Sequence, residues 1–229
     1  MFHWRAEIRP GVSVAFTDTA AGNLALHVGD DPAEVGRRRG ELERTLGLAP
    51  DGLRFMNQVH GTTVAVMEQG SAAPEADAMV SRGLPLAVMV ADCIPVLLAG
   101  ESAEGPVLAA VHAGRPGLAG GVIPAAVASM ESLGASGLRA WLGPSICGNC
   151  YEVPAGMQAE VAAGVPAARS TTSWGTPGLN LPAGARSQLE RLGVSVEYCG
   201  PCTLETPSLF SYRRNNSTGR FAGVVWSHD

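Results

Sequence analysis

The sequence contains no lysine, and this absence excludes several classes of enzyme. All 16 of its basic residues are arginines. A P-loop nucleotide site, a protein-kinase site and a Schiff-base enzyme each depend on a lysine amine, so none of these fits the chain. The 21 acidic residues leave a formal net charge of −5, which argues against a nucleic-acid partner.

A membrane span and a targeting segment are also missing from the sequence. The longest mostly apolar stretch, Leu84–Ala99, contains Asp92 and falls short of the roughly 20 apolar residues that cross a bilayer. The first residues lack the apolar centre of a signal peptide. We therefore expect a cytoplasmic protein without membrane contact, in which the five cysteines are ligands, nucleophiles or core residues rather than a disulfide framework.

The residue pattern predicts one domain of the α/β (α+β) class, because short β-like runs alternate with helices and no stretch resembles a linker. The expected strands are Gly11–Phe16, Thr62–Met67, Leu86–Ala91, Pro95–Ala99, Val107–Val111, Ala140–Leu142, Val194–Tyr198 and Phe221–Trp226. The expected helices are Pro32–Leu46, Gly117–Leu133, one that starts near Pro154, and one from Pro182 to Gly193. Two of the strands, Leu86–Ala91 and Val107–Val111, are wholly apolar, which predicts that other layers of the protein cover both of their faces.

Three possible metal ligands, His60, Cys93 and His112, each stand at the end of an expected strand. A hairpin turn over Gly100–Pro106 would place Cys93 opposite His112 at one edge of a sheet. Imidazole nitrogen and thiolate suit Zn²⁺, and three protein ligands leave the fourth position open, as in catalytic zinc sites. A water in that position would have its pKa lowered to roughly 7.

Two other interpretations of these residues stay open. They fit a buried cysteine with two ordinary core histidines, and they fit a thiol enzyme in which Cys93 is the nucleophile and His112 its base. The metal interpretation accounts better for His60, which the thiol mechanism leaves without a role.

Seven short stretches, in order from residue 23 to residue 219, carry a family likeness. They are Asn23–Asp30 (NLALHVGD), Gln58–Gly61 (QVHG), Ala76–Ser81 (ADAMVS), Ala91–Pro95 (ADCIP), His112–Arg115 (HAGR), Leu142–Val153 (LGPSICGNCYEV) and Phe210–Gly219 (FSYRRNNSTG). Together they resemble the YfiH family, also called the multicopper polyphenol oxidase or laccase-domain family. The resemblance implies a single YfiH-like domain over residues 1–229, a layered sandwich with mixed sheets between helices.

The resemblance also implies a chemistry. It implies zinc, with copper less favoured, held by His60, Cys93 and His112. It implies phosphorolysis of adenosine, inosine and methylthioadenosine, with phosphate as second substrate and adenosine deamination as a further activity. A role in peptidoglycan editing, attached to some members, gives an alternative hypothesis of a protein that binds or edits a cell-wall precursor. Polyphenol oxidation would need several histidine-rich copper centres, which five histidines do not supply.

The matching stretches supply further candidate residues for the substrate site. The candidates for substrate binding are Asn23, Gln58, Asp92 and Arg213. Thr19 stands where the family has an arginine, so we expect Arg115, after His-Ala-Gly, to supply the cation that contacts phosphate. Asp92 and Asp77 could each orient a histidine or cap a turn. His27, within an apolar run, is expected to be a core histidine, and Arg214 either joins Arg213 on phosphate or lies on the surface.

Two Cys-x-x-Cys pairs, Cys147–Cys150 and Cys199–Cys202, remain outside this scheme. A compact zinc ribbon does not fit, because a helix is expected between the pairs. A thioredoxin-like redox motif at Cys199–Cys202 is disfavoured, since Pro207 interrupts the helix that it would need. A spatial cluster of all four sulfurs stays open, and four partly buried thiols are the commoner arrangement.

Overall fold

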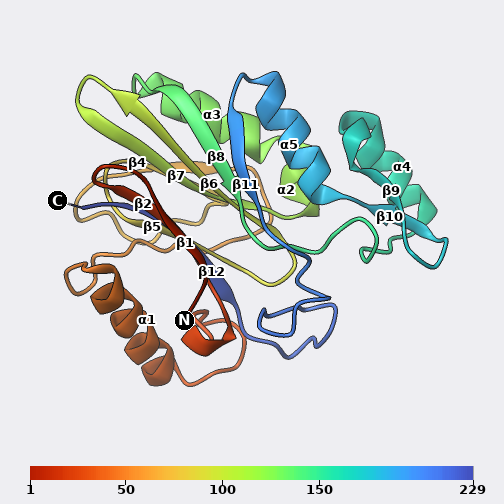
Figure 1. Cartoon of the computed structure of the whole chain (residues 1–229), viewed down its shortest axis with the longest axis horizontal. Helices are drawn as coiled ribbons and strands as arrows, with labels where there is room; N and C mark the ends of the chain where they lie inside the picture. Colours follow the sequence, from red (N-terminus) through yellow and green to blue (C-terminus); the bar gives the residue numbers. More distant parts are fainter. Residues whose placement is uncertain (229) are drawn as a thin grey trace.

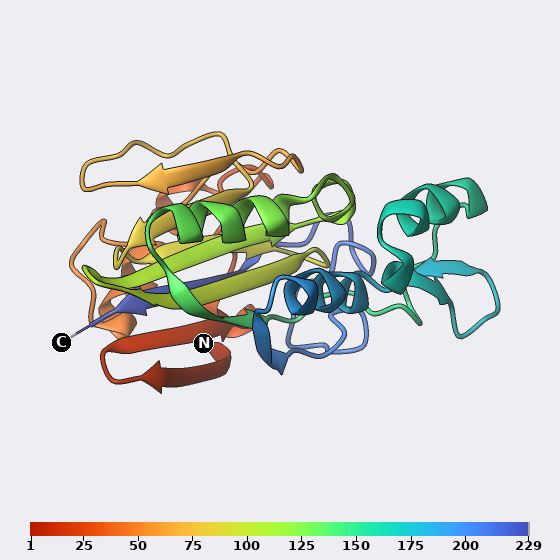
Figure 2. The ribbon, with the colours of Figure 1, turned by 90° about the horizontal axis from the view of Figure 1, so that it is seen from above.

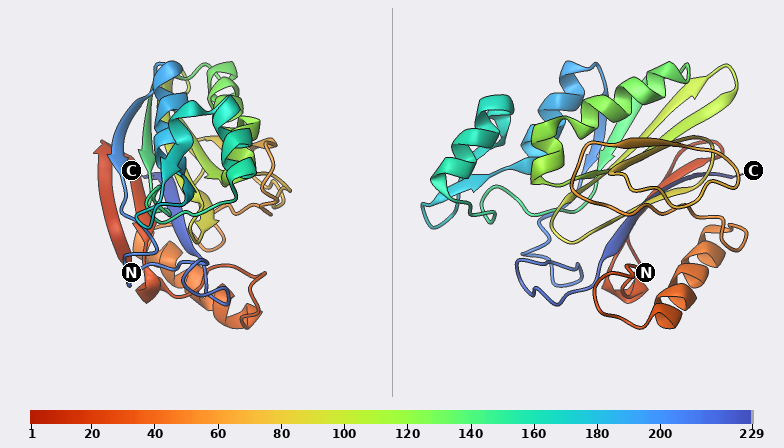
Figure 3. Two further views of the ribbon diagram at one scale, coloured as in Figure 1. Left: turned by 90° about the vertical axis from the view of Figure 1, so that its right-hand side faces the viewer. Right: turned by 180° about the vertical axis from the view of Figure 1, so that it is seen from behind.

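Two β-sheets stacked face to face form the centre of the protein, and helices cover their outer faces (Figure 1). The computed structural model describes residues 1–228. Helix α1 (Pro32–Leu46) lies on one side of the sheets, and α3 (Val122–Ser132) and α5 (Leu181–Arg191) lie on the other, as Figure 3 also shows. This confirms the predicted fold class of mixed sheets between helices.

The larger sheet has six strands in the order β11-β8-β6-β7-β4-β3. Their bounds are β3 (Val64–Met67), β4 (Ala78–Arg82), β6 (Ile94–Ser102), β7 (Gly105–Ala113), β8 (Ser136–Leu142) and β11 (Ser195–Cys199). The outer pairs β3–β4 and β11–β8 are parallel, and the inner pairs are antiparallel. The sheet is therefore mixed, as expected.

The smaller sheet has four antiparallel strands in the order β1-β2-β12-β5. Their bounds are β1 (Phe2–Arg9), β2 (Val12–Thr17), β5 (Leu86–Val90) and β12 (Phe221–Ser227). Sequence patterns did not predict β1 or β4. Strand β1 is an edge strand that carries Arg5, Glu7 and Arg9, and such charges protect an edge from pairing with other chains while they hide its apolar pattern.

The wholly apolar strands bury both faces, as predicted. In β7, Val107 and Val111 face the cluster under α3 and α5, whereas Leu108 packs against the smaller sheet. In β5, Val88 faces the space between the sheets and Met89 faces α1. Side chains of successive strand residues point to opposite faces, so a run of apolar residues is required wherever both faces are covered.

Capping residues explain where the helices begin and end. The Asp31 side chain accepts a hydrogen bond from the N–H of Ala33 at the start of α1, as predicted. The helix expected over Gly117–Leu133 is two helices, α2 (Arg115–Gly120) and α3. Gly121 ends the first with a φ of 92°, a left-handed conformation that favours glycine and turns the chain.

A small unit projects from one end of the sandwich, beside α2 and α5 (Figure 2). It consists of α4 (Ala155–Gly164), the short helix η2 (Pro166–Ala168), and the hairpin of β9 (Arg169–Thr171) and β10 (Pro177–Leu179), of which sequence patterns predicted only α4. A second short helix, η1 (Thr19–Ala21), follows β2. None of the helices within residues 1–228 combines the length and the apolar character needed to cross a membrane.

Candidate functional site

The β6–β7 hairpin brings two of the predicted metal ligands together. Pro95 of β6 lies opposite His112 of β7, so Cys93, just before β6, reaches His112 as predicted. His60 arrives from the loop before β3, with its Nε2 3.8 Å from the Cys93 Sγ and its ring centroid 4.6 Å from that of His112. The ligand atoms of this triad all lie within 4.8 Å of one another.

Asp77, fully buried just before β4, fixes both histidines of the triad. Its Oδ1 lies 2.8 Å from Nδ1 of His112 and accepts the backbone N–H of His60 at 2.9 Å. Its Oδ2 accepts the N–H of Gly61 at 2.6 Å. A hydrogen bond at Nδ1 leaves Nε2 of His112 as the free ligand atom, which is how carboxylates orient metal-binding histidines.

Asp92 has a different role from the histidine-orienting one considered above. Its carboxylate accepts the hydroxyl of Thr203 at 2.6 Å and the backbone N–H of Arg213 at 2.7 Å, and it contacts neither histidine. Asp77 takes the orienting role because it enters from β4, beside β7. Asp92 instead ties the loop that carries Arg213 to the start of β6.

The backbone is strained at two points next to the ligands. His60 has a φ of 61° and Asp92 a φ of 84°, both in the left-handed region that residues other than glycine seldom adopt. Such conformations cost of order 1–3 kcal/mol each and gather at functional sites. The strain directs the side chains of His60 and Cys93 toward the same point.

Glycine keeps the centre of the triad clear. A Cβ on Gly114 would lie 2.9 Å from Cδ2 of His60 and 3.2 Å from the Cys93 Sγ, closer than side chains normally approach. Two imidazole nitrogens and one sulfur therefore converge on a space that any residue larger than glycine would disturb. This donor set fits a zinc ion with an open fourth position.

The electrostatics of the triad favour the thiolate. Burial raises the pKa of the Cys93 thiol, but hydrogen bonds and charge from His112 and His60 outweigh burial and lower the pKa to about 6. Burial lowers the pKa of His112, but Asp77 and Cys93 outweigh it and raise the pKa to about 9. The thiolate is the form in which cysteine binds a metal or attacks a substrate.

The triad forms part of the wall of a cavity of about 430 Å³, a size typical of sites for small molecules. Three arginines stand in the wall, namely Arg115, Arg213 and Arg220. Apolar and aromatic side chains complete it, among them Met89, Ile146, Tyr151, Leu181 and Tyr212. The cavity thus joins a possible metal site, positive charge and an apolar surface.

The substrate-binding candidates Gln58, Asp92 and Arg213 line this cavity, as does the predicted phosphate contact Arg115. The Gln58 amide donates to the carbonyl oxygen of Met89 at 2.7 Å and accepts its N–H at 2.9 Å, so it also fixes the end of β5. The guanidinium of Arg213 lies 5.2 Å from the ring centroid of Tyr151.

Asn23 lies outside the cavity lining. It is buried, and its amide group bonds to both backbone groups of Ala25 and accepts the N–H of Arg220 at 2.9 Å. These bonds hold a turn of the backbone. Arg214 is similarly structural, because its guanidinium donates to backbone carbonyls, including that of Thr203 at 2.9 Å.

The prediction that His27 is a core residue is wrong. The apolar run that contains it buries Leu24 and Ala25, but the chain then turns, and His27 is exposed in the cavity wall. Sequence reasoning missed Arg220, Tyr151 and Tyr212 as wall residues. The two tyrosines lie inside matching stretches and Arg220 follows one directly, so those stretches held the signal that could have identified them.

The cysteine pairs do not form a four-sulfur cluster. Cys147, Cys150 and Cys202 meet with the carboxylate of Glu205, whereas Cys199 is exposed and apart from them. No helix follows Cys199 in the chain up to residue 228, so the thioredoxin-like arrangement is absent there.

Comparison with known proteins gives relatives over nearly the whole chain. A protein of Streptomyces griseus named purine nucleoside phosphorylase is 49% identical over 242 residues, with 98% of each chain covered. One of the same name from Streptomyces coelicolor is 50% identical over 233 residues, with 94% of this chain and 96% of that one covered.

Solved structures agree with the fold. A Neisseria meningitidis protein superposes with a TM-score of 0.84 at 34% identity, over 99% of both chains. YlmD from Geobacillus stearothermophilus gives a TM-score of 0.85 at 25% identity, over 100% of both chains. The family model described as multi-copper polyphenol oxidoreductase laccase matches residues 3–228. The chain therefore belongs to this laccase-domain family, the YfiH family.

Proposed function

We propose that this protein is a zinc-dependent purine nucleoside phosphorylase. The observation that carries the proposal is the cavity in which a His60–Cys93–His112 triad faces a wall of three arginines. Relatives that are 49% and 50% identical over almost the full chain carry the name purine nucleoside phosphorylase. Adenosine, inosine and methylthioadenosine are the proposed nucleosides.

The arginine wall supplies a site for phosphate. No carboxylate within residues 1–228 forms an ion pair with Arg115, Arg213 or Arg220. Arg213 and Arg220 lie against the rings of Tyr151 and Tyr212, at 5.2 and 5.7 Å. Arg220 also donates through its Nη1 to the carbonyl oxygens of Thr218 and Gly219, at 2.8 and 3.1 Å, which holds its guanidinium in place. Planar guanidinium groups bind phosphate oxygens in pairs.

The rest of the wall suits a purine nucleoside. Met89, Ile146 and Leu181 give an apolar surface, and the faces of Tyr151 and Tyr212 allow stacking on an aromatic base. We propose that the base packs against this surface with its ribose directed toward the arginines. The anomeric carbon would then face the phosphate.

The proposed reaction breaks one bond and forms another. A phosphate oxygen attacks the anomeric carbon of the ribose, the bond from that carbon to the purine nitrogen breaks, and the purine leaves with a proton. The arginines hold the phosphate and offset its charge as it approaches. A zinc ion held by His60, Cys93 and His112 would supply Lewis-acid polarisation. Asp77 would keep His112 oriented as one of its ligands.

The first test is an analysis of products. The purified protein is incubated separately with adenosine, inosine and methylthioadenosine, with and without phosphate, and products are identified by liquid chromatography with mass detection. We expect free base and a ribose 1-phosphate that depends on phosphate. Inosine from adenosine would add the deaminase activity that the family resemblance implies. No product from protein with metal bound would contradict the proposal and favour the binding or editing hypothesis.

A second test separates the metal enzyme from a thiol enzyme. The low pKa of Cys93 beside His112 supports a thiol mechanism as the alternative hypothesis. Chelation should abolish phosphorolysis, and zinc should restore it. Activity that survives full removal of metal but is lost on alkylation of Cys93 would favour the thiol mechanism instead.

A further inference from the structure

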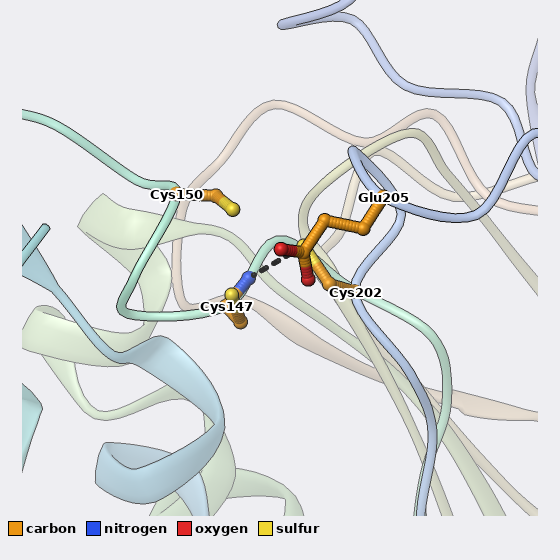
Figure 4. Close-up of side chains that lie close together, drawn as sticks. All are labelled: Cys147, Cys150, Cys202 and Glu205. Atoms are coloured by element: carbon orange, nitrogen blue, oxygen red, sulfur yellow. Dashed lines mark hydrogen bonds between the residues drawn. The ribbon is translucent and has the colours of Figure 1, made fainter. Parts of the chain in front are cut away.

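A second group of possible metal ligands lies outside the cavity lining. The side chains of Cys147, Cys150, Cys202 and Glu205, the thiol cluster, point toward a common space (Figure 4). Their sulfur and carboxylate oxygen atoms all lie within 4.8 Å of one another. None of the four lines the cavity.

Parallel pairing in the larger sheet creates this cluster. Strands β8 and β11 run parallel with Leu142 opposite Cys199, so the segments that follow them leave the sheet side by side. The N–H of Ser145 then donates to the carbonyl of Pro201 at 3.2 Å, and the N–H of Thr203 donates to the carbonyl of Ser145 at 3.1 Å. Residues 147–150 and 202–205 are therefore held next to each other by the backbone.

Local hydrogen bonds hold the cysteines of the cluster in position. The N–H of Cys150 donates to the carbonyl of Cys147 at 3.1 Å, which closes a tight turn between the two cysteines. The Cys202 Sγ accepts the N–H of Cys147 at 3.4 Å, the dashed contact in Figure 4, and also the N–H of Glu205. Amide donors aimed at a sulfur favour its thiolate, but burial and the neighbouring thiols outweigh them and raise the pKa of both Cys150 and Cys202.

The environment is closed on most sides. Cys150 and Cys202 are buried with Ile146 in a small apolar cluster, Cys147 is half-buried, and only Glu205 is exposed. All five cysteines are free thiols. A cation with several thiolate ligands fits this space, since thiolates crowded together without a cation repel one another.

We propose that the thiol cluster binds a second zinc ion, as a structural site with four protein ligands. Three cysteines and a carboxylate give the tetrahedral donor set of a closed zinc site, in contrast to the open triad. This proposal is independent of the reaction proposed above. It would hold even if the cavity bound a cell-wall precursor.

Such an ion would hold the cavity wall in place. Ile146 and Tyr151 flank the cysteine turn, and both line the cavity. Thr203, next to Cys202, donates to Asp92, which also accepts the N–H of Arg213. The second zinc would therefore position an aromatic and an arginine wall residue without contact to substrate.

The test is the metal content of variants, measured by mass spectrometry on protein purified with zinc. We expect two equivalents in the wild type, one in Cys150→Ser, one in Cys93→Ser and two in Cys199→Ser. Cys199→Ser is the matched control, because Cys199 is an exposed thiol outside the cluster. One equivalent in the wild type that Cys150→Ser retains and Cys93→Ser loses would overturn the proposal.

Two further measurements apply if Cys150→Ser does not fold. Glu205→Gln changes an exposed residue, and we expect it to weaken zinc binding at the cluster while the triad keeps its ion. Cobalt added to Cys93→Ser should give the intense absorption of tetrahedral cobalt with several thiolates. A Glu205→Gln affinity equal to wild type, together with no such absorption, would overturn the proposal. A thiol titration that detects only three of the five cysteines, because two have formed a disulfide, would also overturn the proposal.

Discussion

The triad lies in the wall of the cavity and the thiol cluster lies outside its lining, and the two groups differ in how many ligand positions they leave open. The triad has two histidines and one cysteine, faces the cavity, and is fixed by one buried carboxylate, Asp77. The thiol cluster has three cysteines and one glutamate, and none of the four lines the cavity. An incomplete ligand set leaves room for a substrate, whereas a complete set only holds the chain.

The two groups also differ in how the chain supports them. Of the triad residues, His112 lies on β7 and Cys93 directly before β6, and His60, in a loop, has a φ of 61°. Two loop segments carry the whole thiol cluster. We therefore expect changes at the triad to act on turnover, and changes at the cluster to act on stability.

The largest expected effect is that of Cys93→Ser. Loss of the thiolate removes a metal ligand, so we expect phosphorolysis to fall by about 1,000-fold or more, since metal catalysis contributes several kcal/mol. The thermal midpoint should change little. Turnover and melting temperature, measured beside Cys150→Ser, check this. Cys150→Ser should lower the melting temperature and change turnover little. Equal loss of turnover in both variants would contradict the proposed difference between the triad and the thiol cluster.

Asp77→Asn should reduce metal affinity or activity by about 10- to 100-fold, the usual effect of losing a carboxylate behind a metal-bound histidine. The amide keeps the size of the side chain but removes its charge and one of its backbone acceptor positions. Competition with a chelator of known affinity measures the change. Glu104→Gln changes an exposed carboxylate in the turn between β6 and β7. It is the control, and its zinc affinity should match that of the wild type. Wild-type zinc affinity in Asp77→Asn would contradict the role assigned to Asp77.

Gly114→Ala tests the close approach at the triad. Gly114 has a φ of −70°, so alanine adds no backbone strain, and the effect is steric. We expect a loss of about 1–3 kcal/mol in the free energy of unfolding, together with weaker zinc binding. Gly36→Ala on α1 meets open space and should stabilise the protein by about 0.5–1 kcal/mol. Denaturant unfolding measures the free energy of unfolding of both variants. Equal stabilisation by Gly114→Ala and Gly36→Ala would show that the space beside Gly114 is larger than described.

The smallest expected effect is that of Arg115→Ala. One charged hydrogen bond to phosphate contributes about 1.5 kcal/mol, so the KM for phosphate should rise about 10-fold while the KM for the nucleoside stays within about twofold. Steady-state kinetics with each substrate varied in turn measure both constants. Arg186→Ala on α5 is the control, since Arg186 pairs only with Glu190 on that helix. Equal rises in the KM values for phosphate and for the nucleoside would contradict the assignment of Arg115 to phosphate binding.

Local pattern was enough to predict the part of the site that depends on neighbouring segments. The short turn between β6 and β7 fixes the register of the hairpin, so Cys93 and His112 had to meet. Helix α1 was predicted from the start signals Asp31, Pro32 and Glu34, and the Asp31 side chain caps it in the structure. The short matching stretches identified the family, and the ligand role that it implies for His60 stays a prediction.

Pattern alone failed where a position depends on distant segments. His27 looked like a core residue because the two buried residues before it are apolar, and only the folded chain turns it into the cavity. Asp77 and Asp92 had equal sequence support for the orienting role. The parallel strands β3 and β4 and the neighbouring β7 give it to Asp77.

The sequence by itself determined the fold class and the hairpin, because strand periodicity and caps are local properties, and its ligand types predict the chemistry of the triad. Only the tertiary structure decided that Cys202 joins Cys147 and Cys150 while Cys199 does not. The parallel pairing of β8 with β11 sets that choice, since it brings the ends of two strands far apart in the chain to one edge of the sheet. Glu205 completes the cluster by the same pairing, and no local pattern marks it as a ligand.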